Sequence, residues 1–126
     1  DFMQRPFLTE PVIEVGPMIL VPYAEPLSEQ LALNFDAVVE KSNGFLMENH
    51  GAVMVSPEGI WRALEFLEMM EAAARSVLVA HMLGGAKTLS KADVENLNRT
   101  LKTRGQQLPG AVGAVSSLVD LMLFDE

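Results

Sequence analysis

Two short apolar runs, over residues 45–47 and 52–55, flank a polar break in the pattern of hydrophobic and polar positions. The break contains Asn49, His50 and Gly51, which are residues common in turns. Short apolar runs joined by turn residues are typical of two strands in a hairpin, and Gly51 supplies the permissive backbone angles that a tight turn needs. The pattern therefore predicts a β-hairpin that carries His50 at its tip.

The segments upstream of the hairpin predict two strands and a helix. An aliphatic run over 19–21 is typical of a buried strand, and Pro22 ends it because proline cannot donate to a sheet ladder. A second, short strand is predicted over 12–15, after a loop over 1–11. Ser28 is a candidate N-cap for a helix that ends near 43–44.

Downstream of the hairpin, the pattern predicts two helices and a helical tail. The longest helix should start at Ser56-Pro57 and run from about 57 to 83, with two apolar rows that place it between the sheet and another layer or subunit. Ser90 and Asp93 predict a capping box that opens a helix closing near 103–105. Apolar residues at helical spacing continue over 112–123, so the tail over 110–126 is expected to contact a partner chain.

An imidazole at the apex of a stiff hairpin can present a ring nitrogen to a metal or a substrate. From spacing alone, the pattern favours His50 as an ordinary turn residue or a hydrogen-bonded core histidine over a ligand. The chain has one other histidine, His81, at the predicted end of the long helix, where a cationic ring favours the helix C-terminus.

Composition limits the classes of function. At 126 residues and 49% hydrophobic, the chain should form one globular domain over 1–126. Its net charge of -8 repels phosphate backbones and anionic lipids, so neither nucleic acid nor a membrane surface is an expected partner. The absence of cysteine fits a cytoplasmic protein and restricts any metal site to histidine, carboxylate or backbone ligands. The first residue is Asp1, which suggests a piece of a longer chain.

The run 46–51, followed by an apolar strand and a long alanine-rich helix, resembles the class II aldolase/adducin family. Residues 21–32 resemble the proline-tyrosine loop and helix of that family. Segments 89–93 and 101–105 fall where sugar-phosphate aldolases such as fuculose-phosphate aldolase carry their last helix and tail. The resemblance, from about 19 to 108, implies an α/β fold. It would be a three-layer α/β/α sandwich with a largely antiparallel central sheet, here as its C-terminal portion.

The resemblance also implies a metalloenzyme. In that family the histidine of the Asn-His-Gly turn is a zinc ligand, which makes His50 a candidate ligand, Asn49 a residue that orients it and Tyr23 a substrate-binding residue. The other ligands form a His-x-His pair with a nearby glutamate in the N-terminal half of the family fold, and no His-x-His occurs here. The chain would then be an inactive fragment of a Zn²⁺-dependent enzyme. Its substrate would be a small sugar phosphate or hydroxy-carbonyl compound.

One position departs from the fuculose-type pattern. Arg104 stands where those aldolases carry a tyrosine that acts from a neighbouring subunit. A guanidinium cannot give up a proton at neutral pH, although it can bind a substrate carboxylate or phosphate. The departure leaves room for an epimerase, a dehydratase or a decarboxylase.

Two alternatives come from other functional classes. Adducin-type members of the family use this fold as a non-catalytic interaction module, and the apolar tail would suit such a role. An unrelated α/β binding domain is the third possibility. Family aldolases are mostly tetramers, so the resemblance also implies a homo-oligomer.

Overall fold

The computed structural model describes residues 2–124, and its sheet is small and mixed. Its strands are β1 (Ile19–Val21), β2 (Gly44–Met47) and β3 (Gly51–Met54), in the order β1-β2-β3. β1 and β2 are parallel, with Ile19 opposite Phe45, whereas β2 and β3 form the predicted antiparallel hairpin. The hairpin and the strand at 19–21 are therefore confirmed. The resemblance implied a largely antiparallel sheet. Among the described residues, the three strands form one parallel pair and one antiparallel pair.

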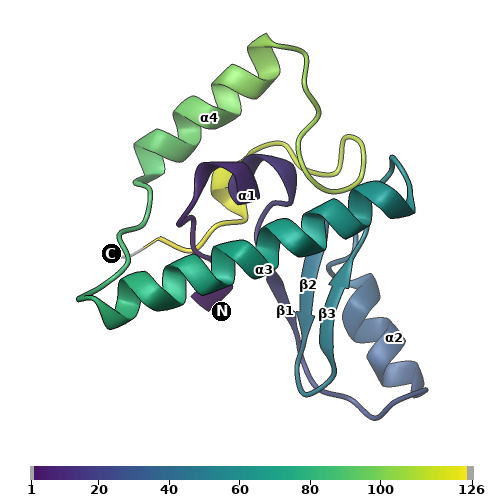
Figure 1. Ribbon diagram of the computed structural model, residues 1–126. Coiled ribbons are helices and arrows are strands. Elements are labelled where there is room, and N and C mark those ends of the chain that lie inside the picture. Colours follow the sequence, from purple (N-terminus) through teal and green to yellow (C-terminus); the bar gives the residue numbers. More distant parts are fainter. Residues whose placement is uncertain (1, 125–126) are drawn as a thin grey trace.

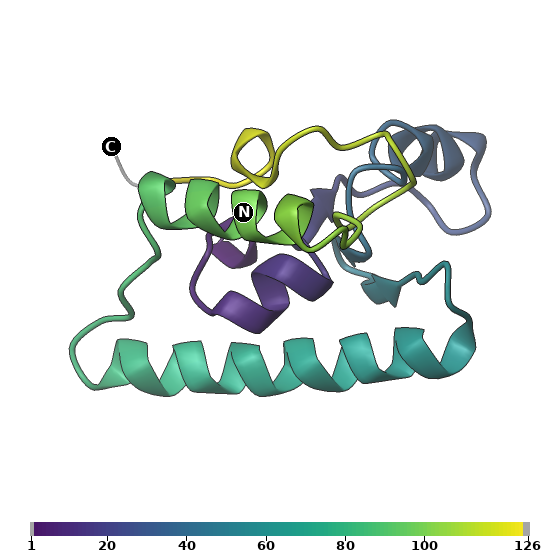
Figure 2. The same ribbon diagram turned by 90° about the horizontal axis from the view of Figure 1, so that it is seen from above.

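Helices cover both faces of this sheet, which makes the fold α/β with three layers. Figure 1 shows α3 (Ile60–Met82) in front of the strands and α2 (Glu29–Asp36) behind them, and Figure 2 shows the same separation from above. The remaining helical segments are η1 (Phe2–Gln4), α1 (Thr9–Glu14), α4 (Lys91–Thr103) and η2 (Leu118–Asp120). No helix among residues 2–124 combines the length and the apolar character needed to cross a bilayer.

The two faces of the sheet bury different side chains, as strand alternation requires. On the α3 face, Met18 packs with Phe66 and Met70 of α3. On the α2 face, Val21 and Phe45 pack with Phe35, whose ring centroid lies 4.8 Å from that of Phe45.

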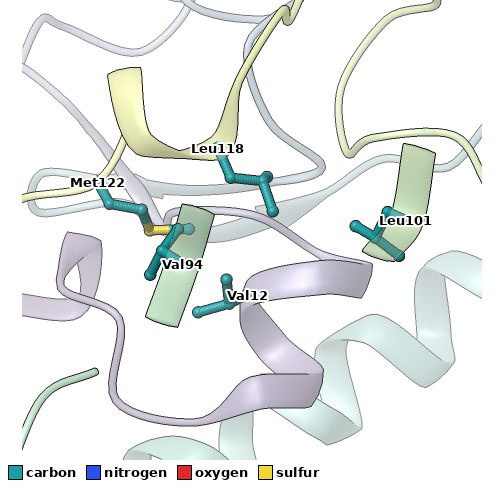
Figure 3. Close-up of a cluster of buried hydrophobic side chains, with 5 residues drawn as sticks. All are labelled: Val12, Val94, Leu101, Leu118 and Met122. Atoms are coloured by element: carbon teal, nitrogen blue, oxygen red, sulfur yellow. The ribbon is translucent and has the colours of Figure 1, made fainter. Parts of the chain in front are cut away.

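The predicted strand over 12–15 is wrong, because most of this segment belongs to α1. Pro11 lies in the first turn of α1, where a missing N–H costs no intrahelical bond. Val12 is buried in a cluster with residues of α4 and the tail (Figure 3). Val12, Ile13 and Val15 fit one buried face of a short helix as well as a strand, so the pattern alone could not separate them.

Two predicted helix boundaries also move. α3 begins at Ile60 and not near Pro57, because the Ser56 hydroxyl accepts from the Glu58 N–H in a turn and Gly59 follows with φ 105°. α2 begins after Ser28, as predicted, with the Ser28 hydroxyl accepting from the Leu31 N–H, but it ends at Asp36.

The tail does not form the predicted helix. It contains only the short segment η2, and its start is shaped by Gly110 and Gly113, which have φ values of 92° and 78°. Leu118 and Met122 are buried against α1 and α4, and Figure 3 shows both side chains directed toward Val12 and Val94. These tail residues thus complete the core of their own chain. A subunit contact by the tail stays a prediction, and its last residues, 125–126, lie outside the described part of the chain, as does residue 1.

Candidate functional site

The parallel pairing of β1 and β2 brings two segments that are distant in sequence to the same edge of the sheet. Their carboxyl ends lie side by side, so the loop 22–26 meets the turn 48–50. The Glu48 N–H donates to the Val21 carbonyl at 3.0 Å. The Glu48 carboxylate in turn accepts from the Tyr23 N–H at 3.0 Å. Glu48 therefore holds the end of β1 through its backbone and the loop through its side chain.

The turn between β2 and β3 places its residues through an unusual backbone conformation. Asn49 has φ 59°, in the left-handed region that asparagine tolerates better than most residues. The His50 N–H donates to the Met47 carbonyl at 2.9 Å, and Gly51 follows with φ 129°. Asn49 thus reverses the chain and leaves His50 exposed at the tip of the hairpin.

The His50 ring is oriented by the loop. Its Nε2 lies 2.8 Å from the Ala24 carbonyl oxygen. A carbonyl only accepts, so Nε2 carries the proton and Nδ1 is left as the acceptor of the neutral ring. The Tyr23 ring stacks on the His50 ring with centroids 5.5 Å apart and an interplanar angle of 13°. The imidazole is exposed and yet held in one orientation by two neighbours.

The loop itself is tied to α2. The Asn34 side-chain amide donates to the Pro22 carbonyl at 3.2 Å, and Gln30 donates to Asn34 at 2.8 Å. Sequence reasoning missed Asn34 and the role of Glu48. Glu48 precedes the Asn-His-Gly turn directly, so a carboxylate two residues from a candidate ligand was a usable signal, whereas nothing in the sequence indicated Asn34.

The other candidate residue from the sequence, Arg104, lies elsewhere. It is the exposed C-cap of α4, and Figure 1 shows α4 at the opposite end of the molecule from the turn between β2 and β3. His81 lies near the end of α3, with its ring 6.1 Å from that of Phe2. One chain therefore brings together Tyr23, Asn49 and His50, and leaves Arg104 apart from them.

This site offers a metal ion one oriented ligand, the His50 ring. A metal-binding histidine usually donates its second ring N–H to a carbonyl or carboxylate, and the contact between His50 and Ala24 has this form. Within residues 2–124, however, no group of three or more histidine, cysteine, aspartate or glutamate side chains is close enough to hold an ion. His50 is therefore suited to be one ligand of a metal ion, and the described residues do not supply the other ligands.

Residues 3–78 match the family described as Class II Aldolase and Adducin N-terminal domain. Two solved structures are similar to the chain. YgbL from Escherichia coli is 26% identical with a TM-score of 0.65, and YgbL from Klebsiella pneumoniae is 28% identical with a TM-score of 0.66. Both are provisionally described as aldolase/epimerase/decarboxylase.

In each case the similarity covers 74% of this chain and 44% of the YgbL chain, so this chain spans less than half the length of those proteins. A comparison with curated proteins found no match. The family match covers well over half of the 126 residues, and it includes the loop and the turn that orient His50. This chain belongs to the class II aldolase/adducin family.

Proposed function

We propose that the chain supplies one metal-binding histidine, His50, to a Zn²⁺-dependent enzyme of the class II aldolase type. The observation that supports this most is the ring itself, which is exposed at the carboxyl ends of two parallel strands and oriented by Ala24 and Tyr23. When bound, zinc would polarise a substrate carbonyl. The substrate would be a small sugar phosphate or hydroxy-carbonyl compound, and the chain alone would be inactive because the ligand set is incomplete.

Each residue of the site has a role in this proposal. Nδ1 of His50 would face the ion, while Asn49 sets the turn and Glu48 holds the loop through the Tyr23 N–H. Tyr23 would line the substrate cleft, since its side chain is 50% exposed beside the ring. Arg104 would contact substrate only from a neighbouring subunit of a homo-oligomer, because it caps α4, which lies at the opposite end of the molecule from the turn between β2 and β3.

The test compares the two histidines of the chain under Zn²⁺ titration. The imidazole C–H signals of His50 and His81 are followed by NMR and assigned with the variants His50→Gln and His81→Gln. The His50 signal should move at a lower Zn²⁺ concentration than the His81 signal, with weak affinity because about three protein ligands are normally needed. Movement of both signals at the same Zn²⁺ concentration, or movement of the His81 signal at a lower one, would remove His50 from the proposal.

A non-catalytic interaction module is the second candidate. It is favoured by exposed apolar side chains on α3, such as Ile60 and Trp61. This alternative predicts that neither histidine prefers Zn²⁺, so the same titration separates the two functions.

A further inference from the structure

The peptide group between Pro22 and Tyr23 is held on both sides by side chains from different elements. The Asn34 side-chain amide, on α2, donates to the Pro22 carbonyl at 3.2 Å. The Tyr23 N–H belongs to the same peptide group and donates to the Glu48 carboxylate, in the hairpin turn, at 3.0 Å. In a trans peptide the C=O and the N–H point in opposite directions within one plane. Asn34 and Glu48 therefore fix the direction of this plane together.

This peptide plane lies directly before the two groups that orient His50. The Tyr23 ring stacks on the imidazole, and the Ala24 carbonyl oxygen lies 2.8 Å from its Nε2. Because a backbone has only two soft dihedral angles per residue, rotating the plane would displace the ring and the carbonyl that follow it. Figure 1 shows the loop after β1 passing the end of the hairpin on its way to α2.

Burial contributes little to the order of this loop. Within residues 22–27, Ala24 is buried and the others are exposed. Leu27 is fully exposed and has φ 64°, a left-handed conformation that costs a leucine free energy. A loop with so little buried apolar surface depends on its hydrogen bonds for local stability. The bonds on the two sides of the peptide plane should therefore decide how the loop is placed.

The amide of Asn34 is itself oriented by its own helix. The Gln30 side chain, one turn earlier on α2, donates to the Asn34 Oδ1 at 2.8 Å. With the oxygen occupied in this way, the NH₂ group of Asn34 faces the Pro22 carbonyl, which can only accept. Position 34 thus requires a donor, and a carboxylate there would place one acceptor against another.

We propose that Asn34 is a positioning residue for the His50 ring, which acts through the peptide group between Pro22 and Tyr23 and shares this role with Glu48. Helix α2 thereby influences the orientation of a candidate ligand on the hairpin. The relevance of this role to metal binding rests on the proposed function, whereas the orientation of the ring is a property of the chain alone.

The test compares two substitutions on α2 that each convert an amide into a carboxylate. Asn34→Asp removes the donor to Pro22, whereas Gln30→Glu leaves that donor in place and makes the same change in charge one turn away. Asn34→Asp should speed hydrogen exchange at the Tyr23 amide about fivefold, as expected for one lost hydrogen bond, and Gln30→Glu should change it by less than about twofold. In NMR spectra, only Asn34→Asp should move the His50 imidazole C–H signals toward those of an unstacked histidine.

A double substitution tests whether the two anchors act on one peptide group. Side chains that hold the same group have non-additive effects. In the Glu48→Ala background, Asn34→Asp should therefore move the His50 signals at most about half as far as it does in the natural chain. Asn34→Ala removes the donor without adding charge, and it replaces Asn34→Asp in both comparisons if the latter disturbs the amide signals of β2.

Unchanged His50 signals in both Asn34 variants would overturn the proposal, as would equal movement in Gln30→Glu or fully additive effects with Glu48→Ala. Zn²⁺ titration of the same samples keeps this inference separate from the proposed function. If Asn34→Asp moves the His50 signals as expected while the natural chain shows no preference of Zn²⁺ for His50 over His81, the positioning role stands and the proposed function fails.

Discussion

Tyr23 and His50 lie 27 positions apart in sequence, and their rings stack with centroids 5.5 Å apart and an angle of 13° between them. The contact joins the loop after β1 to the turn after β2, so it depends on the parallel pairing of those strands. Stacking restricts the imidazole to one plane, and the Ala24 carbonyl fixes its rotation within that plane. The site is therefore organised before any ligand arrives.

Replacing Tyr23 should release the His50 ring. An aromatic neighbour shifts the NMR signals of stacked ring protons, so Tyr23→Leu should move the His50 imidazole signals toward those of an exposed histidine, whereas Tyr23→Phe should preserve them. Under Zn²⁺ titration, the His50 signals of the leucine variant should also move only at higher metal concentration. Identical His50 signals in the two variants would show that the rings do not stack in solution.

The carboxylate of Glu48 should protect one backbone amide in particular. Because the Tyr23 N–H donates to Glu48 Oε2, Glu48→Ala should speed hydrogen exchange at Tyr23 severalfold. Glu48→Gln keeps an acceptor oxygen and should change exchange much less. Exchange at Val21 and Leu46 serves as the internal control, and acceleration there as well would indicate general loosening of the sheet.

Much of the fold could be predicted where the signal is local. The residues of the capping box, Ser90 and Asp93, are three positions apart, and their hydrogen bonds depend on few other residues. The Asn-His-Gly turn likewise has its own backbone preferences. The short segment around Val12 could not be assigned, because three apolar residues among four positions suit either a helix or a strand. The burial of Leu118 and Met122 within their own chain could not be predicted, since the sequence does not reveal that α1 and α4 leave space for them.

Three residues of the candidate site could be predicted from the sequence, but their contacts could not. The sequence indicates His50, Asn49 and Tyr23, whereas the role of Glu48 follows from the parallel register of β1 and β2, which periodicity does not encode. Arg104 is a candidate only through its place in the family resemblance. Its distance from the turn in one chain is a property of the tertiary fold.

Ser42 should contribute strongly to stability although it lies outside the site. Its hydroxyl is fully buried, contacts the Val15 and Pro17 carbonyls at 3.0 and 2.6 Å, and accepts from the Gly44 N–H. Ser42→Ala would remove these bonds and leave the Pro17 carbonyl and the Gly44 N–H without the hydroxyl, whereas the Val15 carbonyl still accepts from the Asn43 N–H. The substitution should lower the free energy of unfolding by about 1–3 kcal/mol in urea titrations. Ser76→Ala, at an exposed helical position, should cost less than about 0.5 kcal/mol, and a comparable loss in both would contradict this assignment.

Gly110 should be far less tolerant of alanine than Gly113. Both have left-handed φ values, of 92° and 78°, and therefore share a backbone penalty of about 1–3 kcal/mol. Only at Gly110 would the new Cβ lie 2.5 Å from the Glu40 carbonyl oxygen, whereas nothing lies within 4 Å at Gly113. Gly110→Ala should therefore lose about 1–3 kcal/mol more stability than Gly113→Ala in urea unfolding, as expected for overpacking. Equal losses would mean that the tail does not pack beside residue 40.

The capping box of α4 should make stability depend on pH through Asp93. The Ser90 hydroxyl and then the Ser90 N–H donate to this carboxylate, and they lower the pKa of Asp93 below its ordinary value. A pKa lower in the folded than in the unfolded chain stabilises the fold above about pH 4, and this contribution disappears as the pH falls through the folded pKa.

The stability difference between the natural chain and Asp93→Asn, measured by urea unfolding at several pH values, should therefore be largest near neutral pH and shrink below about pH 4. Glu95→Gln removes an exposed acidic residue from the same helix without touching the cap, so it controls for net charge. A difference for Asp93→Asn that stays constant down to pH values well below 4 would show that the carboxylate is not held by Ser90. A parallel decline for Glu95→Gln would instead assign the effect to overall charge, because the chain starts from a net charge of -8.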